Sequence, residues 1–150
     1  NTLTHKVIEA FQGGLLKNAV HAAAILDELH PPTDRGTRRV VLGSSDGTRG
    51  VHVLPLEIEF GHWQIYELPS VDLKKVRDWF NAHLGAPYDY LAAASMTCPF
   101  WHDKAGAWNC SESVCEAIGF TDPSQLPPSV LADICDTLGE NVTAEFFGLT

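Results

Sequence analysis

The sequence lacks any hydrophobic run long enough to span a membrane. A transmembrane helix needs about 20 consecutive apolar residues, and every apolar stretch in this chain of 150 residues is shorter. The N-terminus also lacks the basic stretch followed by an apolar run that marks a secretory leader. We therefore expect no membrane span and no signal peptide.

Positive charge is scarce as well. Ten Lys and Arg residues face 19 Asp and Glu residues, which gives a formal net charge of -9. An acidic chain is repelled by phosphate backbones and anionic lipid surfaces, so we expect neither nucleic-acid nor membrane-surface binding. The basic cluster of Arg35, Arg38, Arg39 and Arg49 is interrupted by turn residues and is interpreted as the solvated rim of a hairpin.

Metal-site and disulfide patterns are missing too. The four cysteines, Cys98, Cys110, Cys115 and Cys135, include no CxxC pair, and the seven histidines include no HxH or HExxH motif. Four cysteines in a chain of this length are too few for a disulfide scaffold. We expect free thiols, no metal and no other cofactor.

The composition that remains is that of one globular domain covering residues 1–150. Hydrophobic residues make up 45% of the chain and charged residues 19%, and a chain of this length buries about two-thirds of its unfolded surface. The sequence contains no internal repeat, and it contains no linker long enough to separate two domains.

The order of predicted elements favours an α+β fold, with a block of about four strands between helices. The strands are expected at 19–29, 38–42, 50–56 and 62–68, with a turn cluster at 43–47. Helices are expected at 4–16, 70–84, 88–95, 110–118 and 129–138, with Ser70 or Asp72 capping the second and Gly119 ending the fourth.

The segment Trp108–Val114 carries the sharpest chemical signal. Asn109 is a preferred N-cap residue, and Glu112 stands three positions later, as in a capping box. This predicts that Cys110 is the first residue of a helix. Unpaired N–H groups and the helix dipole stabilise a thiolate there, so we expect a pKa below the reference of about 8.5. The same N–H groups suit a developing oxyanion.

The other reading of Cys110 is a small, inert residue buried under a helix start. Cys115 follows five positions later, about 140° round the helix, so it is interpreted as core. Cys98, which precedes Pro99, and Cys135, in the last predicted helix, are also interpreted as structural.

A cysteine nucleophile needs a base, and this is most often a histidine. His21 precedes the small apolar segment 22–26, where an imidazole is either a satisfied core residue or a catalytic one. His52 and His62 head or flank later strands and are alternatives. The remaining four are expected to be solvent-exposed: His5, His30, His83 and His102.

Three short motifs together resemble the NlpC-type papain-like cysteine hydrolases. They are Val20–Ile25 around the histidine, Gly85–Tyr90 with its Gly-x-x-Tyr-Asp pattern, and Asn109–Val114 with Cys-Ser-Glu-x-Val. Their order is similar to the circularly permuted branch that includes the lecithin:retinol acyltransferase-like and YiiX-like proteins and small phage-encoded members. The likeness runs over about residues 21–128, and it implies an antiparallel sheet packed against helices.

The resemblance implies that Cys110 is the nucleophile, that His21 is the general base, and that a third residue on the next strand orients the imidazole. That strand offers Ser44 or Ser45 where the family often has a carboxylate, a His or an Asn. A backbone carbonyl is the alternative orienter. Tyr88 is a candidate hydroxyl donor at the substrate site, and support of the helix is its alternative role.

The function expected from these motifs is a cysteine-dependent acyl-transfer hydrolase that cleaves an amide bond. The implied substrates are peptidoglycan stem peptides or small amino-acid amides. A lipid acyl hydrolase or acyltransferase is one alternative, and a catalytically weak binding or virion-associated module of the same fold is another. Together with the missing signal peptide, the resemblance favours the cytoplasm of a bacterial host or a virion as the location.

Overall fold

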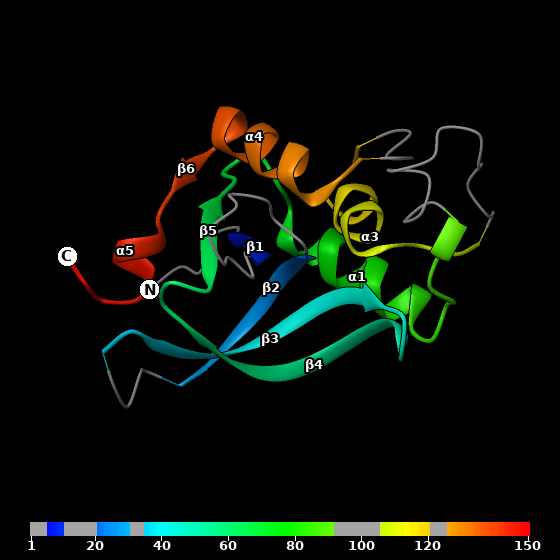
Figure 1. Cartoon of the computed structure of the whole chain (residues 1–150), viewed down its shortest axis with the longest axis horizontal. Helices are drawn as coiled ribbons and strands as arrows, with labels where there is room; N and C mark the ends of the chain where they lie inside the picture. The colour runs from blue at the N-terminus through cyan, green and yellow to red at the C-terminus, as the bar shows by residue number, and fades with distance from the viewer. Residues whose placement is uncertain (1–5, 11–20, 31–34, 92–105, 121–125) are drawn as a thin grey trace.

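The computed structural model describes residues 6–10, 21–30, 35–91, 106–120 and 126–150 (Figure 1). It has the predicted α+β architecture, with helices packed on an antiparallel sheet. The expectations for Cys98, His5 and His102, and for most of the helix at 88–95, lie outside the described residues.

The described sheet has the strand order β4-β3-β2-β1-β5-β6, and every neighbouring pair is antiparallel. The strands are β1 (Lys6–Ala10), β2 (His21–His30), β3 (Thr37–Asp46), β4 (Gly50–Glu59), β5 (Trp63–Glu67) and β6 (Glu140–Asn141). The described helices are α1 (Leu73–His83), α3 (Cys110–Ala117), α4 (Pro128–Leu138) and α5 (Thr143–Phe146).

The helix predicted at 4–16 is wrong over its described part, because Lys6–Ala10 is strand β1. The apolar spacing of Val7 and Ile8 with later residues fits a helical stripe, but it also fits a buried strand. Pairing with β2 on one side and β5 on the other decides the outcome. These partners come from other parts of the chain, so the local pattern did not reveal them.

The predicted hairpin of β3 and β4 is confirmed, but the turn predicted at 43–47 is misplaced. Strand β3 continues through Gly43, Ser44 and Ser45 to Asp46, and the chain reverses between Asp46 and Gly50. The Asp46 carboxylate accepts hydrogen bonds from the backbone N–H groups of Thr48 and Arg49 and so holds this turn. As a result, both serines lie within a strand.

Two apolar clusters hold the fold together. The cluster containing Ala22, Ala24 and Leu26 of β2 includes residues of α1, α3 and α4. The cluster containing Ala23 and Ile25 includes residues of α5. Since successive residues of a strand point to opposite faces, the small side chains of β2 serve both clusters. Figure 1 shows α1, α3 and α4 together on one side of the sheet, whereas α5 lies apart from them, beside β5.

The segment after α1 is docked onto the start of β4. The N–H of Val51 donates to the carbonyl of Ala86, and the N–H of Gly85 donates to the carbonyl of Val51. Gly50 has a φ of 67°, and a Cβ at this position would lie 2.1 Å from the Ala86 carbonyl oxygen. A glycine is therefore required for this close approach, which brings Tyr88 towards the end of β3.

Candidate active site

The predicted start of α3 is confirmed. The Asn109 side-chain oxygen accepts from the N–H of Glu112 at 2.9 Å, and the Glu112 carboxylate accepts from the N–H of Asn109 at 2.8 Å. This reciprocal capping box makes Cys110 the first helical residue. The local sequence therefore predicts that this thiol stands at the N-terminus of a helix, and the fold buries that helix start.

The Cys110 sulfur lies against the start of β2. It is within hydrogen-bonding reach of the backbone N–H of Ala22, the residue that follows His21. The Cys110 residue is only 5% exposed, and burial raises the pKa of its thiol, while the Ala22 N–H opposes this rise. The prediction of a lowered thiol pKa is therefore wrong, because loss of water outweighs the local donors.

His21 is hydrogen-bonded to one of the two candidate serines. The Ser44 hydroxyl donates to the Ala22 carbonyl at 2.6 Å, and its oxygen lies 3.1 Å from His21 Nε2. A hydroxyl has only one hydrogen to donate, so Nε2 is the donor in the second contact. His21 Nε2 therefore carries the proton, and Nδ1 of the neutral ring is left with a lone pair.

Ser44 also closes a gap in the sheet. The backbone pairing of β2 with β3 runs from His30 only as far as Ala24 opposite Gly43. Beyond that point the Ser44 hydroxyl accepts from His21 and donates to the carbonyl of Ala22. Between the two alternatives left by the sequence, Ser44 is thus the residue that contacts the imidazole.

Ser45 contacts the segment before α3. Its hydroxyl donates to the carbonyl of Trp108 at 2.7 Å, just before α3. Neighbouring residues of β3 point to opposite faces, and Ser45 stands opposite Val51 of the cluster that contains α3. Ser45 therefore anchors the segment that leads to Cys110.

His52 and Asp46 lie near His21 and influence its charge. Burial lowers the pKa of His21, His52 acts in the same direction, and Asp46 opposes them. His52 Nδ1 lies 2.9 Å from the Gly50 carbonyl and 3.7 Å from the Asp46 carboxylate. His21 is therefore a neutral imidazole near pH 7, and its neighbourhood includes a second histidine that the sequence suggested only as a substitute.

Tyr88 belongs to the same neighbourhood. Burial, together with the nearby Cys110 and Glu112, raises the pKa of Tyr88 to about 12. Its phenol therefore keeps its proton over the physiological range and can act as a hydrogen-bond donor. The carbonyl of Pro87 accepts from the N–H of Trp108, which fastens the Tyr88 segment to the residues before α3.

His62 and His83 do not join this group, and the predicted exposure of the His30 side chain lies outside what the structure describes. His62 is exposed and lies 3.7 Å from Glu59. His83 is half-buried, stacked on Trp79 at a centroid distance of 4.1 Å and approached by the edge of Trp108, so its predicted exposure is wrong. The stack with Trp79 is an i, i+4 contact within α1, whereas the contact with Trp108 joins segments distant along the chain and has no local sequence signal.

Within the described residues, no three His, Cys, Asp or Glu side chains are grouped so that they could hold a metal ion. Cys110, Cys115 and Cys135 are all free thiols. In the same part of the chain, no helix has the length and apolar character needed to cross a bilayer.

An open apolar groove runs along α4, some distance in the chain from these residues. It is lined by Phe120, Val130, Asp133, Ile134, Thr137 and Leu138. None of the candidate site residues lines this groove.

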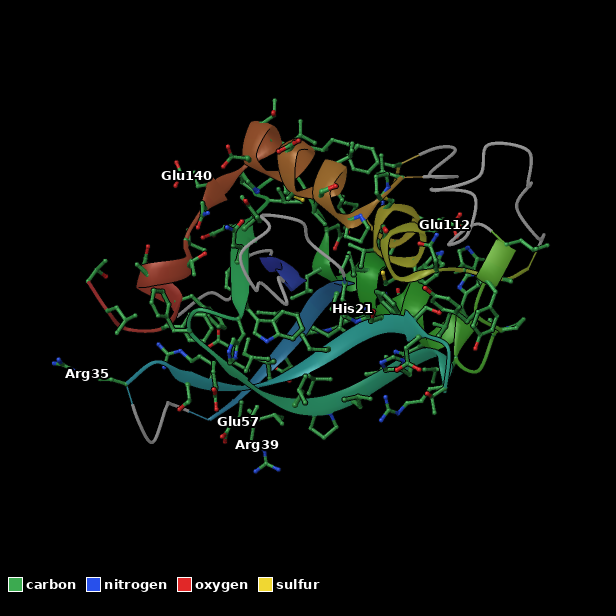
Figure 2. All side chains as sticks on the ribbon, in the orientation of Figure 1. His21, Arg35, Arg39, Glu57, Glu112 and Glu140 are labelled. Carbon is green, nitrogen blue, oxygen red and sulfur yellow. The ribbon has the colours of Figure 1, made fainter. Side chains whose placement is uncertain are left out.

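Figure 2 shows His21 at the end of β2 nearest α1 and α3, with Glu112 on α3. Segments far apart in the sequence thus meet here: the start of β2, the end of β3, Tyr88 and the first turn of α3. Comparison with known proteins adds no relative, since no family model, curated protein or solved structure matches the chain.

Proposed function

We propose that the protein is a cysteine-dependent acyl-transfer hydrolase with Cys110 as nucleophile and His21 as general base. The main observation in support is that the Cys110 sulfur is within reach of the N–H of Ala22, next to His21. A papain-like fold of the circularly permuted NlpC type is part of the proposal, supported by the three motifs and by the antiparallel sheet with helices packed on it.

The resting state in this proposal has a neutral thiol at Cys110 and a neutral imidazole at His21. Burial raises the pKa of Cys110 and lowers that of His21, so both shifts disfavour a thiolate–imidazolium pair. The proton must then leave sulfur as the substrate is attacked, and His21 Nδ1 is the group with a free lone pair to accept it.

The chemistry proceeds in two balanced halves. In the first, sulfur bonds to the carbonyl carbon, His21 takes the thiol proton, and the leaving amine departs with that proton as the carbon–nitrogen bond breaks. In the second, water attacks the thioester, His21 accepts a proton from water, and the thiol is restored as the acid product leaves.

Ser44 is the positioning residue in this scheme. Because its oxygen accepts from His21 Nε2, it favours the tautomer whose Nδ1 is basic. Tyr88, whose phenol remains protonated, supplies a candidate donor to the substrate. We propose an amide in a peptidoglycan stem peptide or a small amino-acid amide as substrate, because the motifs resemble enzymes with those substrates.

One observation favours a second function, a binding or virion-associated module with little turnover. Cys110 is almost fully buried and burial raises its pKa, which are the properties of an unreactive thiol. The two functions differ in whether Cys110 forms a covalent acyl intermediate.

The test is acylation by 4-nitrophenyl acetate, followed by nitrophenolate release and by the mass of the Cys110 peptide. A hydrolase shows a burst of one nitrophenolate per chain and an acetyl group on Cys110, and both disappear in Cys110→Ala. Equal, slow acetylation of several cysteines supports the binding module instead.

The substrate class is tested separately. Purified peptidoglycan fragments and a panel of fatty-acyl esters are incubated with the protein and with Cys110→Ala, and the products are identified by mass. Cys110-dependent cleavage of the fragments supports the amide substrate. Cleavage confined to the acyl esters supports the lipid alternative and overturns the peptidoglycan proposal.

A further inference from the structure

The first turn of α3 contains a buried hydrogen-bond donor that the proposed mechanism has not used. Asn109 is 0% exposed, and its side-chain oxygen is occupied by the N–H of Glu112. An N–H can donate only to the oxygen of the carboxamide, so this contact fixes which end of the side chain is nitrogen. The Nδ2 atom has no hydrogen-bond partner among the described residues.

An unpaired buried NH₂ group is costly, so it calls for an explanation. Capping does not explain it, because Asp, Ser and Thr supply the same acceptor to a helix N-terminus without adding an unpaired donor. The Ser111 hydroxyl, in the same turn, is also buried and has no nitrogen or oxygen partner among the described residues, but it lies within hydrogen-bonding reach of the Cys110 sulfur. The donor that remains without a partner is thus on the residue immediately before Cys110.

The position of Nδ2 relates it to the reacting carbonyl. Asn109 directly precedes Cys110, and its side chain folds over the end of the helix to reach the N–H of Glu112. The nitrogen of the same planar group must therefore lie at the N-terminal end of α3, next to the residue whose sulfur would attack. When the sulfur attacks the substrate's carbonyl carbon, the carbonyl oxygen becomes negatively charged and needs hydrogen-bond donors at this end of the helix.

The capping box removes two backbone donors from this end of the helix. It occupies the N–H groups of both Asn109 and Glu112, and it places the buried Glu112 carboxyl group in the same turn. A carboxylate near a developing negative charge is unfavourable. A neutral NH₂ donor aimed at the oxyanion offsets this repulsion without adding charge.

We propose that Asn109 Nδ2 donates a hydrogen bond to the substrate carbonyl oxygen as it becomes an oxyanion, which makes Asn109 a catalytic residue. This inference rests on the proposed acyl-transfer function. In the step it serves, the Cys110 sulfur bonds to the carbonyl carbon, the thiol proton passes to His21 Nδ1, and the carbonyl electron pair moves onto oxygen. The pair returns when the leaving group departs.

The experiment compares two reactions of the same thiol. Acylation by 4-nitrophenyl acetate passes through an oxyanion, whereas alkylation by iodoacetamide displaces iodide and forms none. Both rates are measured on the full chain at Cys110, by mass of the modified peptide. The primary variant is Asn109→Ser, which keeps a neutral N-cap acceptor and removes the donor.

Asn109→Ser is expected to slow acylation by about 100-fold, the usual effect of deleting one oxyanion donor, and to leave the alkylation rate within about twofold. Asp72→Ser is the matched control. Asp72 caps α1 by accepting from the N–H of Lys74, so this substitution also replaces one N-cap residue by serine, but in a different helix. Both rates should be unchanged in the control.

Two results overturn the role of Asn109: Asn109→Ser slows acylation and alkylation equally, or it slows neither. The proposed function still stands in both cases if the unchanged chain shows Cys110-dependent acylation. Absence of Cys110-dependent acylation in the unchanged chain overturns the proposed function itself. If Asn109→Ser does not fold, Asn109→Thr, a second neutral cap without an NH₂ group, replaces it with the same expected selective loss.

Discussion

Helices α3 and α4 both bring a buried cysteine to the same apolar cluster, but their first turns differ. Cys115 and Cys135 are each 0% exposed and belong to that cluster. Helix α4 begins at Pro128 without a side-chain cap, whereas α3 begins with a capping box and a turn of buried polar residues. Burial alone therefore does not distinguish Cys110. Its polar surroundings at a helix start do.

The largest expected effect comes from replacing, one at a time, the cysteines of the two helices by alanine. Cys110→Ala should abolish acylation by 4-nitrophenyl acetate, because the nucleophile is gone. Cys115→Ala and Cys135→Ala should keep the acylation rate and lose about 1–2 kcal/mol of unfolding free energy, as expected for a small cavity in the core. Denaturant melts and burst kinetics measure the two properties, and an unchanged burst in Cys110→Ala contradicts the comparison.

Removing the base should have the next largest effect. His21→Ala is expected to slow acylation by about 100-fold, within the usual range for general-base catalysis. In the unchanged chain, acylation should fall with decreasing pH only at a pKa below 6.5, because burial lowers the pKa of His21. A pH–rate profile measures this limb. A limb at or above pH 7 would argue against His21 as the base.

The two neighbouring serines offer a smaller, paired test. Ser44→Ala should slow acylation by about tenfold, because Nε2 loses its acceptor and the tautomer with a basic Nδ1 is less favoured. Ser45→Ala removes only the contact to the Trp108 carbonyl and should lower the unfolding free energy by about 1 kcal/mol. Imidazole ¹⁵N shifts of His21 should change in Ser44→Ala and not in Ser45→Ala.

The smallest expected effect is the pH dependence of stability. Because the folded protein lowers the pKa of His21, the unfolded chain binds more protons just below pH 6.5, and stability falls as the pH drops through that window. The slope from this group is at most about 1.4 kcal/mol per pH unit. Thermal melts from pH 7.5 to 5.5 should show a shallower decline in His21→Gln than in the unchanged chain.

The elements with strong local signals could be predicted from the sequence. The cap at Asn109, the stop at Gly119 and the apolar stripe of α1 each lie within a few residues, and the structure has a helix where each predicts one. Strand β1 was misassigned because its identity depends on β2 and β5. Strand β6 has only two residues and is defined by its pairing with β5, so no local pattern indicates it.

The candidate site divides in the same way. The position of Cys110 in its helix follows from the capping residues, but the pKa of its thiol follows from burial by the rest of the fold. The choice of Ser44 over Ser45 depends on where the backbone pairing of β2 and β3 stops. The amide of Ala22 was missed altogether, because every residue but proline carries one and sequence gives no sign of which will meet a sulfur.

The contact at Gly50 suggests a way to reshape the site from outside it. Position 50 lies at the hairpin tip. A methyl group there would collide with the Ala86 carbonyl, in the segment that carries Tyr88. Gly50→Ala would thus strain the hairpin tip and displace the segment that carries Tyr88 without altering a reacting group. If the proposed acyl-transfer function holds, variants that accept bulkier acyl groups would be sought first at this glycine.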